Sequence, residues 1–296
     1  MRFGDEGESS NFEDVTGRSG GGFGLGGGGN ALGCLLPMVA SRFGIGGVIV
    51  LVVGYFLLSS LGGLGSGGGG GGLIPGSQQS APAGKSTLDP NTERFVRQVL
   101  KSTEETWGKL LGGRYQPTTL VAYSREYQSG CGAAQSAMGP FYCPTDTKIY
   151  LDTEFFNELT QRFQAPGDFA MAYVIAHEVG HHVQDLQGSL EQAHNLQARA
   201  SETEGNAIQV KIELQADCYA GVWAANAKDP QGQSVMEPGD FEEGMRAAEA
   251  IGDDTLQKQS QGVVVPDSFT HGTSAQRVAA LRTGLQSGNP EACKSI

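Results

Sequence analysis

The stretch that decides the fold is AYVIAHEVGHH, residues 172–182, a little past the middle of the chain. It continues an apolar run that begins at residue 170, and such a run is typical of a buried helix, which we place at residues 169–187. On a helix, His177 and His181 are four residues apart and project from one face. Their imidazoles can therefore converge on one metal ion.

The pattern His-Glu-x-x-His indicates a catalytic zinc site. Zinc binds imidazole nitrogens, and a catalytic zinc has three protein ligands and one position left for water. Glu178 is displaced around the helix from both histidines, so its carboxylate can reach the water rather than the metal. We predict one zinc ion per chain, held by His177, His181 and a third residue, with Glu178 as the general base.

The third ligand is predicted on a second helix, residues 206–227, which contains ELQAD at residues 213–217. Its two carboxylates are again four residues apart on one helical face. Glu213 can complete the metal site, and Asp217 can accept the ring N–H of a ligand histidine and fix its tautomer. Without the histidine motif, such a pair is more often a solvated face.

Three further histidines differ in what their surroundings predict. His182 projects about 100° around the helix from His181, and His194 lies in a polar helix, so we exclude both as ligands. His271 lies in a loop, residues 269–273, from which a polar side chain can lean over a site. We take His271 as a second catalytic candidate that stabilises a developing oxyanion, the alternative being a capping or hydrogen-bonding role.

The chain from residue 87 to 296 predicts one α+β domain, mostly helical with a small sheet. Asp89-Pro90 is typical of a helix start, and the segments TTLVAYS and KIYLD are typical of short strands. The strands are predicted at residues 118–124 and 148–152. After the helix that carries the histidines, further helices are predicted at residues 189–203, 206–227, 239–258 and 274–286.

The first third of the chain has a different composition, because 26 of the 46 glycines fall within residues 1–76. We predict a disordered, glycine-rich tail at residues 1–42 and a flexible Gly/Pro/Ser linker at residues 65–86. Between them, residues 43–64 are uncharged and mostly apolar, long enough at about 1.5 Å per residue to cross a hydrocarbon layer of about 30 Å. A transmembrane helix is favoured over a signal peptide or a core helix.

The charges around this segment predict its orientation. Arg2, Arg18 and Arg42 precede it, and no basic residue follows until Lys85, so the N-terminus is expected in the cytoplasm. The catalytic domain of this single-pass protein is then expected outside the cytoplasm. In that compartment Cys131 and Cys143 are a plausible disulfide, with two unpaired buried thiols as the alternative.

The composition also excludes two classes of protein. A net charge of −12 argues against a nucleic-acid-binding face. The five cysteines contain no C-x-x-C pair, which argues against a zinc site built from thiols.

These motifs resemble the putative neutral zinc metallopeptidases of the YpfJ-like family, a bacterial group whose members carry an N-terminal membrane segment. The placement of E-x-x-x-D is also similar to that of gluzincin peptidases. The resemblance implies Glu213 as the third ligand and a zincin fold, in which an active-site helix packs beneath a small sheet. It is carried by residues 9–14, 133–152, 172–182, 213–221 and 269–278.

The sequence therefore predicts a membrane-anchored zinc metallopeptidase that hydrolyses peptide bonds in a polypeptide substrate. The substrate is expected to lie extended along a sheet edge, for which residues 149–151 are the candidate. Two alternatives stay open. One is a non-hydrolytic, zinc-stabilised interaction module anchored in the membrane. The other is a zinc enzyme that cuts a different amide, such as a cell-wall peptide cross-link.

Overall fold

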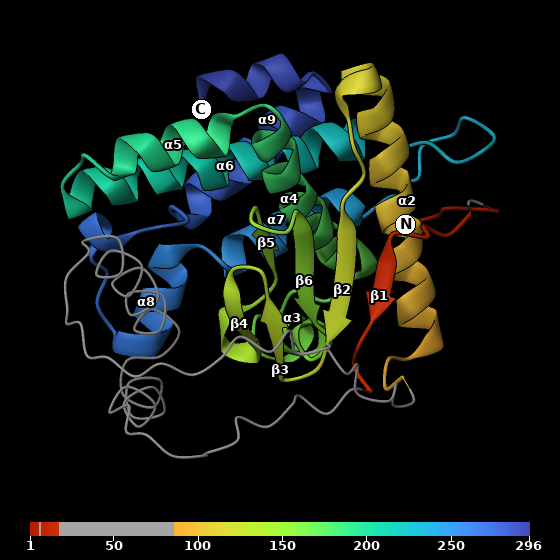
Figure 1. Ribbon diagram of the computed structural model, residues 1–296, viewed down its shortest axis with the longest axis horizontal. Helices are drawn as coiled ribbons and strands as arrows, with labels where there is room; N and C mark the ends of the chain where they lie inside the picture. The colour runs from red at the N-terminus through yellow and green to blue at the C-terminus, as the bar shows by residue number, and fades with distance from the viewer. Residues whose placement is uncertain (6, 18–85) are drawn as a thin grey trace, which may run out of the picture.

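The computed structural model describes residues 1–5, 7–17 and 86–296 (Figure 1). Its main sheet has the strand order β1-β2-β6-β5, in which the first three strands are parallel and β5 is antiparallel to β6. A separate antiparallel hairpin is formed by β3 and β4. The strands are β1 Phe12–Asp14, β2 Thr119–Tyr123, β3 Glu126–Ser129, β4 Gly132–Gln135, β5 Phe141–Cys143 and β6 Lys148–Asp152.

Helices make up most of the rest. The α-helices are α2 Pro90–Leu111, α3 Phe155–Gln161, α4 Asp168–Leu186, α5 Ser189–Gln197, α6 Glu202–Asn226, α7 Asp240–Ala250, α8 Asp253–Gln261 and α9 Ser274–Ser287. Short 3₁₀ helices are η1 Gly112–Arg114, η2 Ser136–Met138, η3 Pro266–Ser268 and η4 Pro290–Ser295.

The sheet has two covered faces because its side chains alternate. Leu120 and Ile149 point into the large core that the sheet shares with α2 and α4. Val121 and Tyr150 point to the opposite face, where Ala134 of the β3–β4 hairpin covers them. The helical layer and the hairpin thus lie on opposite faces of the sheet, as Figure 1 shows.

Helix α4 is the centre of the helical layer and is buried along most of its length. It packs against α2, α6 and α7, which explains why its sequence is apolar on nearly every side. At Gly180 it approaches α6 closely: a Cβ built there would lie 3.0 Å from the backbone oxygen of Ala216. A glycine between the two histidines therefore permits the contact with the helix that carries Glu213.

Helices α6 and α9 cross even more closely, again at glycines. A Cβ on Gly221 would lie 2.1 Å from the backbone oxygen of Leu281, and one on Gly284 would lie 1.8 Å from that of Cys218. Both contacts are with backbone atoms, which cannot rotate away. The C-terminal helix is thereby held against the helix of the predicted third ligand.

Most predicted elements are confirmed, with differences at their ends. Helix α5 ends at Gln197, so the predicted helix at residues 189–203 is too long. The predicted helix at residues 239–258 is two helices, α7 and α8, which are separated at Ile251-Gly252. A Cβ on Gly252 would lie 2.3 Å from the backbone nitrogen of Ser274, so the break serves a close contact with the start of α9. Strands β1, β3, β4 and β5 and helix α3 were not predicted.

The N-terminal residues correct the predicted tail. Residues 1–5 and 7–17 belong to the folded domain, since β1 pairs in parallel with β2 and Phe12 is buried. Ser9 and Asn11 donate hydrogen bonds to Glu104 of α2. A three-residue strand beside glycine-rich sequence gives too short a pattern to detect, and its stability comes from the sheet it joins.

The rest of the predicted tail, the predicted transmembrane helix at residues 43–64 and nearly all of the linker at residues 65–86 lie outside the described residues. Within the described ranges, no helix combines the length and apolar character that a membrane crossing needs. Strand β1 pairs with β2, so residues 12–14 belong to the sheet of the domain.

Two disulfides cross-link the domain. Cys131 and Cys143 are joined, as predicted, with their Cα atoms 5.8 Å apart. A second disulfide joins Cys218 of α6 to Cys293 of η4 across 75 residues of sequence. The second pair was not predicted, because nothing in the local pattern connects residues so far apart.

We expect Gly284→Ala to lower the free energy of unfolding by about 3 kcal/mol, since the new methyl group would overlap the backbone of α6. Urea unfolding of the full chain measures the change. The matched control is Gly205→Ala on α6, where no atom lies within 4 Å of the new Cβ. The control should be neutral or stabilising by up to about 1 kcal/mol. Equal effects at both positions would contradict the close crossing of α6 and α9.

Candidate metal centre

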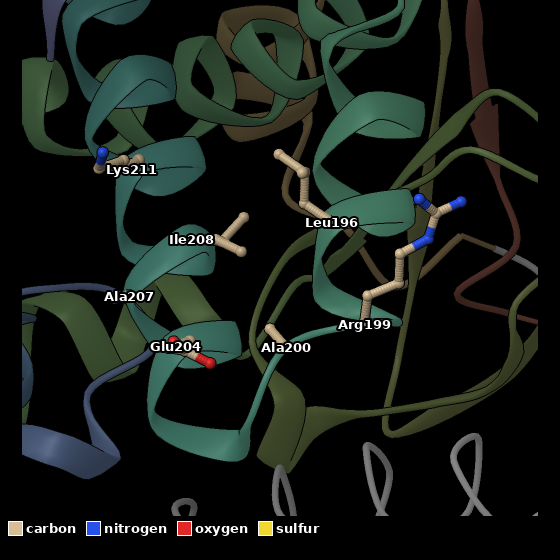
Figure 2. Close-up of a pocket in the computed structure, with 7 residues that line it drawn as sticks. All are labelled: Leu196, Arg199, Ala200, Glu204, Ala207, Ile208 and Lys211. Atoms are coloured by element: carbon tan, nitrogen blue, oxygen red, sulfur yellow. The ribbon is translucent and has the colours of Figure 1, made fainter.

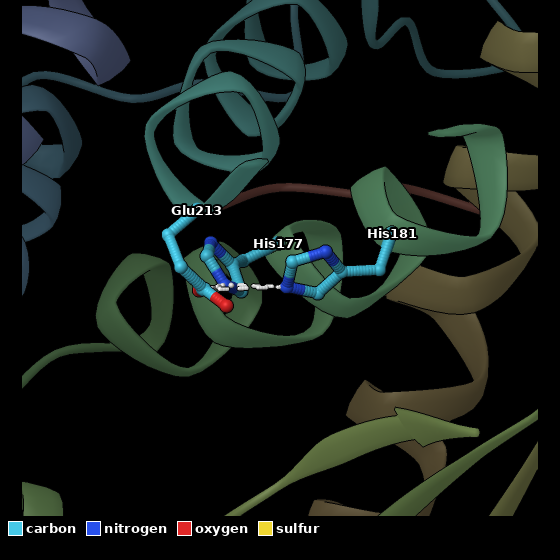
Figure 3. Close-up of side chains that lie close together, drawn as sticks. All are labelled: His177, His181 and Glu213. Atoms are coloured by element: carbon cyan, nitrogen blue, oxygen red, sulfur yellow. Dashed lines mark hydrogen bonds and ion pairs between the residues drawn. The ribbon is translucent and has the colours of Figure 1, made fainter. Parts of the chain in front are cut away.

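The three predicted ligands converge in space. His177 and His181 extend from α4 and Glu213 extends from α6, and the three side chains point toward one another in Figure 3. His177 Nε2 lies 3.1 Å from Glu213 Oε2 and 3.2 Å from His181 Nε2. His181 Nε2 lies 3.5 Å from Glu213 Oε2. One atom from each residue thus forms a small triangle.

The triangle has the dimensions of one face of a zinc coordination tetrahedron. With zinc–ligand distances of about 2.1 Å, the ligand atoms of such a tetrahedron lie about 3.4 Å apart. The three observed separations bracket that value. Among the described residues, no fourth side chain joins the group, so the donor set is the open His₂Glu type. The residues present fit a zinc ion.

Asp217 orients His177, as predicted, and has further partners that were not. Its Oδ1 accepts hydrogen bonds from His177 Nδ1 at 2.8 Å and from the hydroxyl of Tyr173 at 2.6 Å. Arg277 of α9 binds both oxygens of Asp217, through Nε and Nη2, at 2.9 Å each. All four side chains are buried. The aspartate therefore joins α4, α6 and α9 beneath the metal centre.

The charges of the cluster favour a cation. Burial opposes ionisation of Asp217, but the Arg277 guanidinium and His177 outweigh burial and lower the pKa of Asp217 to about 2. Burial likewise opposes ionisation of Glu213, but His181 and His271 hold its pKa well below the usual range. Burial disfavours a charged His177, yet Asp217 and Glu213 raise its pKa to about 10. A site that attracts a proton so strongly also attracts a metal ion, which competes with that proton.

Glu178 lies beside the triangle without being part of it. Its carboxylate is buried, and burial raises its pKa against the opposing influence of both histidines. The backbone N–H of Tyr142 in strand β5 lies near this carboxylate and favours its ionised form. Since β5 is an edge strand of the described sheet, the predicted general base lies between the metal centre and that edge.

The predicted substrate strand at residues 149–151 is therefore wrong. Those residues belong to β6, which is hydrogen-bonded on one side to β2 and on the other to β5. An interior strand has no free backbone groups for a peptide. The edge strand next to β6 is β5, which was missed because it is only three residues long.

His271 is held by Asp253, the first residue of α8. One carboxylate oxygen of Asp253 accepts backbone N–H bonds from Thr270, His271 and Gly272 at 2.8, 2.6 and 3.0 Å. Its other oxygen lies 3.4 Å from His271 Nδ1. Burial lowers the pKa of His271, but the carboxylates of Glu213 and Asp253 outweigh this and raise it. The two carboxylates thus favour the protonated form of this ring.

Among the described residues, the other two histidines lie outside the three-donor group. His182 is buried, with its ring nitrogens near the hydroxyl of Tyr142 and the backbone oxygen of Gln116. His194 is exposed on α5. The supporting residues Arg277 and Tyr173 were missed. Tyr173 precedes His177 by one helical turn, a spacing that could have indicated it.

A groove of about 500 Å³ lies between α5 and α6, apart from the metal donors. Leu196 of α5 and Ile208 of α6 extend into it, as Figure 2 shows. Arg199 and Lys211 also line it. None of the residues that line the groove belongs to the metal centre, so we assign it no part in the chemistry.

We expect Asp217→Asn to weaken zinc binding by about 10- to 100-fold, because the amide leaves His177 without a charged acceptor. Competition with a chromogenic chelator measures the dissociation constant. The matched control is Asp229→Asn, a buried carboxylate after α6 that belongs to neither group of possible metal donors among the described residues. Unchanged zinc affinity in Asp217→Asn would remove the role assigned to this residue.

Comparisons with known proteins agree with this geometry. The family model for "putative neutral zinc metallopeptidase" matches residues 1–296. The chain is 45% identical over its full length to the uncharacterized protein YpfJ of Escherichia coli K12, of which it covers 99%. It is 41% identical over 203 residues to the uncharacterized protein Mb2605 of Mycobacterium bovis, covering 66% of this chain and 67% of that protein. No solved structure matches it. The chain belongs to the family of putative neutral zinc metallopeptidases.

Proposed function

We propose that the protein is a zinc-dependent endopeptidase in which Glu178 is the general base. The observation that carries the proposal is the position of Glu178, buried beside a three-donor site and near the backbone of the edge strand. A purely structural zinc site usually has four protein ligands and no use for such a base. This difference favours hydrolysis over the non-hydrolytic interaction module.

A polypeptide substrate fits the edge strand. Among the strands that the structure describes, β5 pairs only with β6, so an extended peptide can add to its other side through backbone hydrogen bonds. The backbone N–H of Tyr142 already points toward Glu178. A peptide bound along β5 would therefore pass the general base.

Glu178 and His271 supply the proton transfer and charge stabilisation. A bound zinc ion would polarise the scissile carbonyl and lower the pKa of water. Glu178 accepts the proton of the attacking water and then donates it to the leaving amine nitrogen. His271, whose Nδ1 faces Asp253, keeps Nε2 available to donate a hydrogen bond to the developing oxyanion.

We expect Glu178→Gln to retain a full equivalent of zinc and to lose peptidase activity by at least about 100-fold, because an amide cannot accept the proton. Turnover of an unfolded protein and metal content are measured on the same full-length preparation. Glu191→Gln, an exposed change on α5, is the control. Activity in Glu178→Gln equal to that of the parent would reject the general-base role.

We further propose that residues 43–64 associate with a membrane and that the metal centre lies outside the cytoplasm. The apolar length of this segment supports the first part, and two disulfides in the domain support the second. Because β1 belongs to the same sheet as β2, we place the N-terminus on the same side as the metal centre.

Protease treatment of spheroplasts that express the chain with different tags at its two ends tests this placement. Both tags should be cleaved, and the protein should sediment with membranes. Protection of both tags would contradict an extracytoplasmic domain. Protection of the N-terminal tag alone would favour the single crossing and contradict the β1–β2 pairing in the membrane-bound protein.

A further inference from the structure

We propose that Gln184 is a positioning residue that fixes the tautomer of His181 and aims its Nε2 at the metal. Gln184 lies on α4, three residues after His181, and is fully buried. The inference rests on the zinc site of the proposed function and not on hydrolysis. No sequence motif pointed to this glutamine.

Hydrogen bonds define how the Gln184 side chain is oriented. Its Nε2 donates to the backbone oxygen of Ile212 at 2.8 Å and to Gln215 Oε1 at 2.9 Å. A backbone oxygen can only accept, so the atom facing Ile212 must be the amide nitrogen. The other amide atom, Oε1, then faces His181 Nδ1 at 2.8 Å.

This orientation determines where the proton of His181 sits. The amide oxygen of Gln184 can only accept, so His181 Nδ1 must carry the hydrogen. In the neutral ring, Nε2 then has a free lone pair. That lone pair belongs to the atom that lies 3.2 Å from His177 Nε2 and 3.5 Å from Glu213 Oε2. Gln184 thus selects the tautomer that can bind a metal.

The two histidines are therefore held by partners of different charge. His177 donates to the carboxylate of Asp217, whose charge Arg277 balances. His181 donates to a neutral amide. A carboxylate in place of Gln184 would add a further buried negative charge that needs a counter-charge, whereas an amide fixes the ring without one. An amide that also has both its hydrogens bonded cannot rotate without losing those bonds.

The support for Gln184 extends to the C-terminal end of the described chain. Gln215 Nε2 donates to the backbone oxygen of Cys293 at 3.2 Å. Cys293 is buried in η4 and joined by its disulfide to Cys218, which lies on α6 beside Asp217. Hydrogen bonds thus run from His181 to Gln184, from Gln184 to Gln215, and from Gln215 to the backbone oxygen of Cys293. The disulfide holds Cys293, and with it this last acceptor, in place.

The competing interpretation is that Gln184 only joins α4 to α6. Gln187 offers the matched control, because its Oε1 accepts a hydrogen bond from the hydroxyl of Tyr219 on α6 and touches no metal donor. Both Gln184→Leu and Gln187→Leu remove a link between the two helices. Only Gln184→Leu removes the acceptor of His181.

We expect Gln184→Leu to weaken zinc binding by about 10- to 100-fold and Gln187→Leu to leave it within about twofold. Chelator competition on the full-length variants measures both. Equal zinc affinity in the parent and Gln184→Leu, or equal losses in both variants, would overturn the proposal. The milder Gln215→Leu, which removes one of the two acceptors of the Gln184 amide, should weaken binding less than Gln184→Leu.

A measurement on the parent needs no variant to fold. Nitrogen-15 NMR of the metal-free protein, at a pH where His181 is neutral, should show its hydrogen on Nδ1. A hydrogen on Nε2 would overturn the proposal. A parent that binds zinc with this tautomer but hydrolyses nothing would reject the proposed function and leave the inference intact.

Discussion

The metal centre depends on one buried carboxylate. Asp217 accepts hydrogen bonds from His177 and Tyr173 on α4 and forms a two-point ion pair with Arg277 on α9. Breaking such a pair would leave an uncompensated charge in the protein interior, a cost of several kcal/mol. Three helices are thus constrained by the same group that orients a metal donor. Asp217 therefore supports both the packing of the helices and the metal site.

Close helix packing makes this arrangement possible. Gly180 lets α4 approach α6, and Gly221 and Gly284 let α6 and α9 cross backbone to backbone. These short separations let Arg277 reach Asp217, and Asp217 reach His177. Glycine has a cost within a helix of about 1 kcal/mol relative to alanine. Here the close helix contacts that glycine permits offset that cost.

The sequence was most informative where the chemistry needs a fixed spacing. His177, His181 and Glu213 were predicted because a helix translates a spacing of four residues into one shared face. Arg277 was not, because its partner Asp217 lies on another helix. Gln184 lies only three residues after His181 on α4, but its orientation is set by Ile212 and Gln215 of α6, which no local pattern relates to it. Strands β1 and β5 were not predicted for another reason: each is only three residues long, and the neighbouring strands provide their stability. Tertiary contacts define both kinds of feature.

Charge balance explains why the site suits a divalent cation in particular. Glu178, Glu213 and Asp217 are buried carboxylates within one cluster, and the buried guanidinium of Arg277 pairs with Asp217. Farther out, His271 lies beside Asp253. With the three carboxylates ionised and both imidazoles at the metal neutral, the inner group carries three negative charges and one positive charge. Uncompensated buried charge is costly, and a dication removes the excess of two. The raised pKa of His177 has the same cause, because a proton on this ring neutralises part of the excess negative charge.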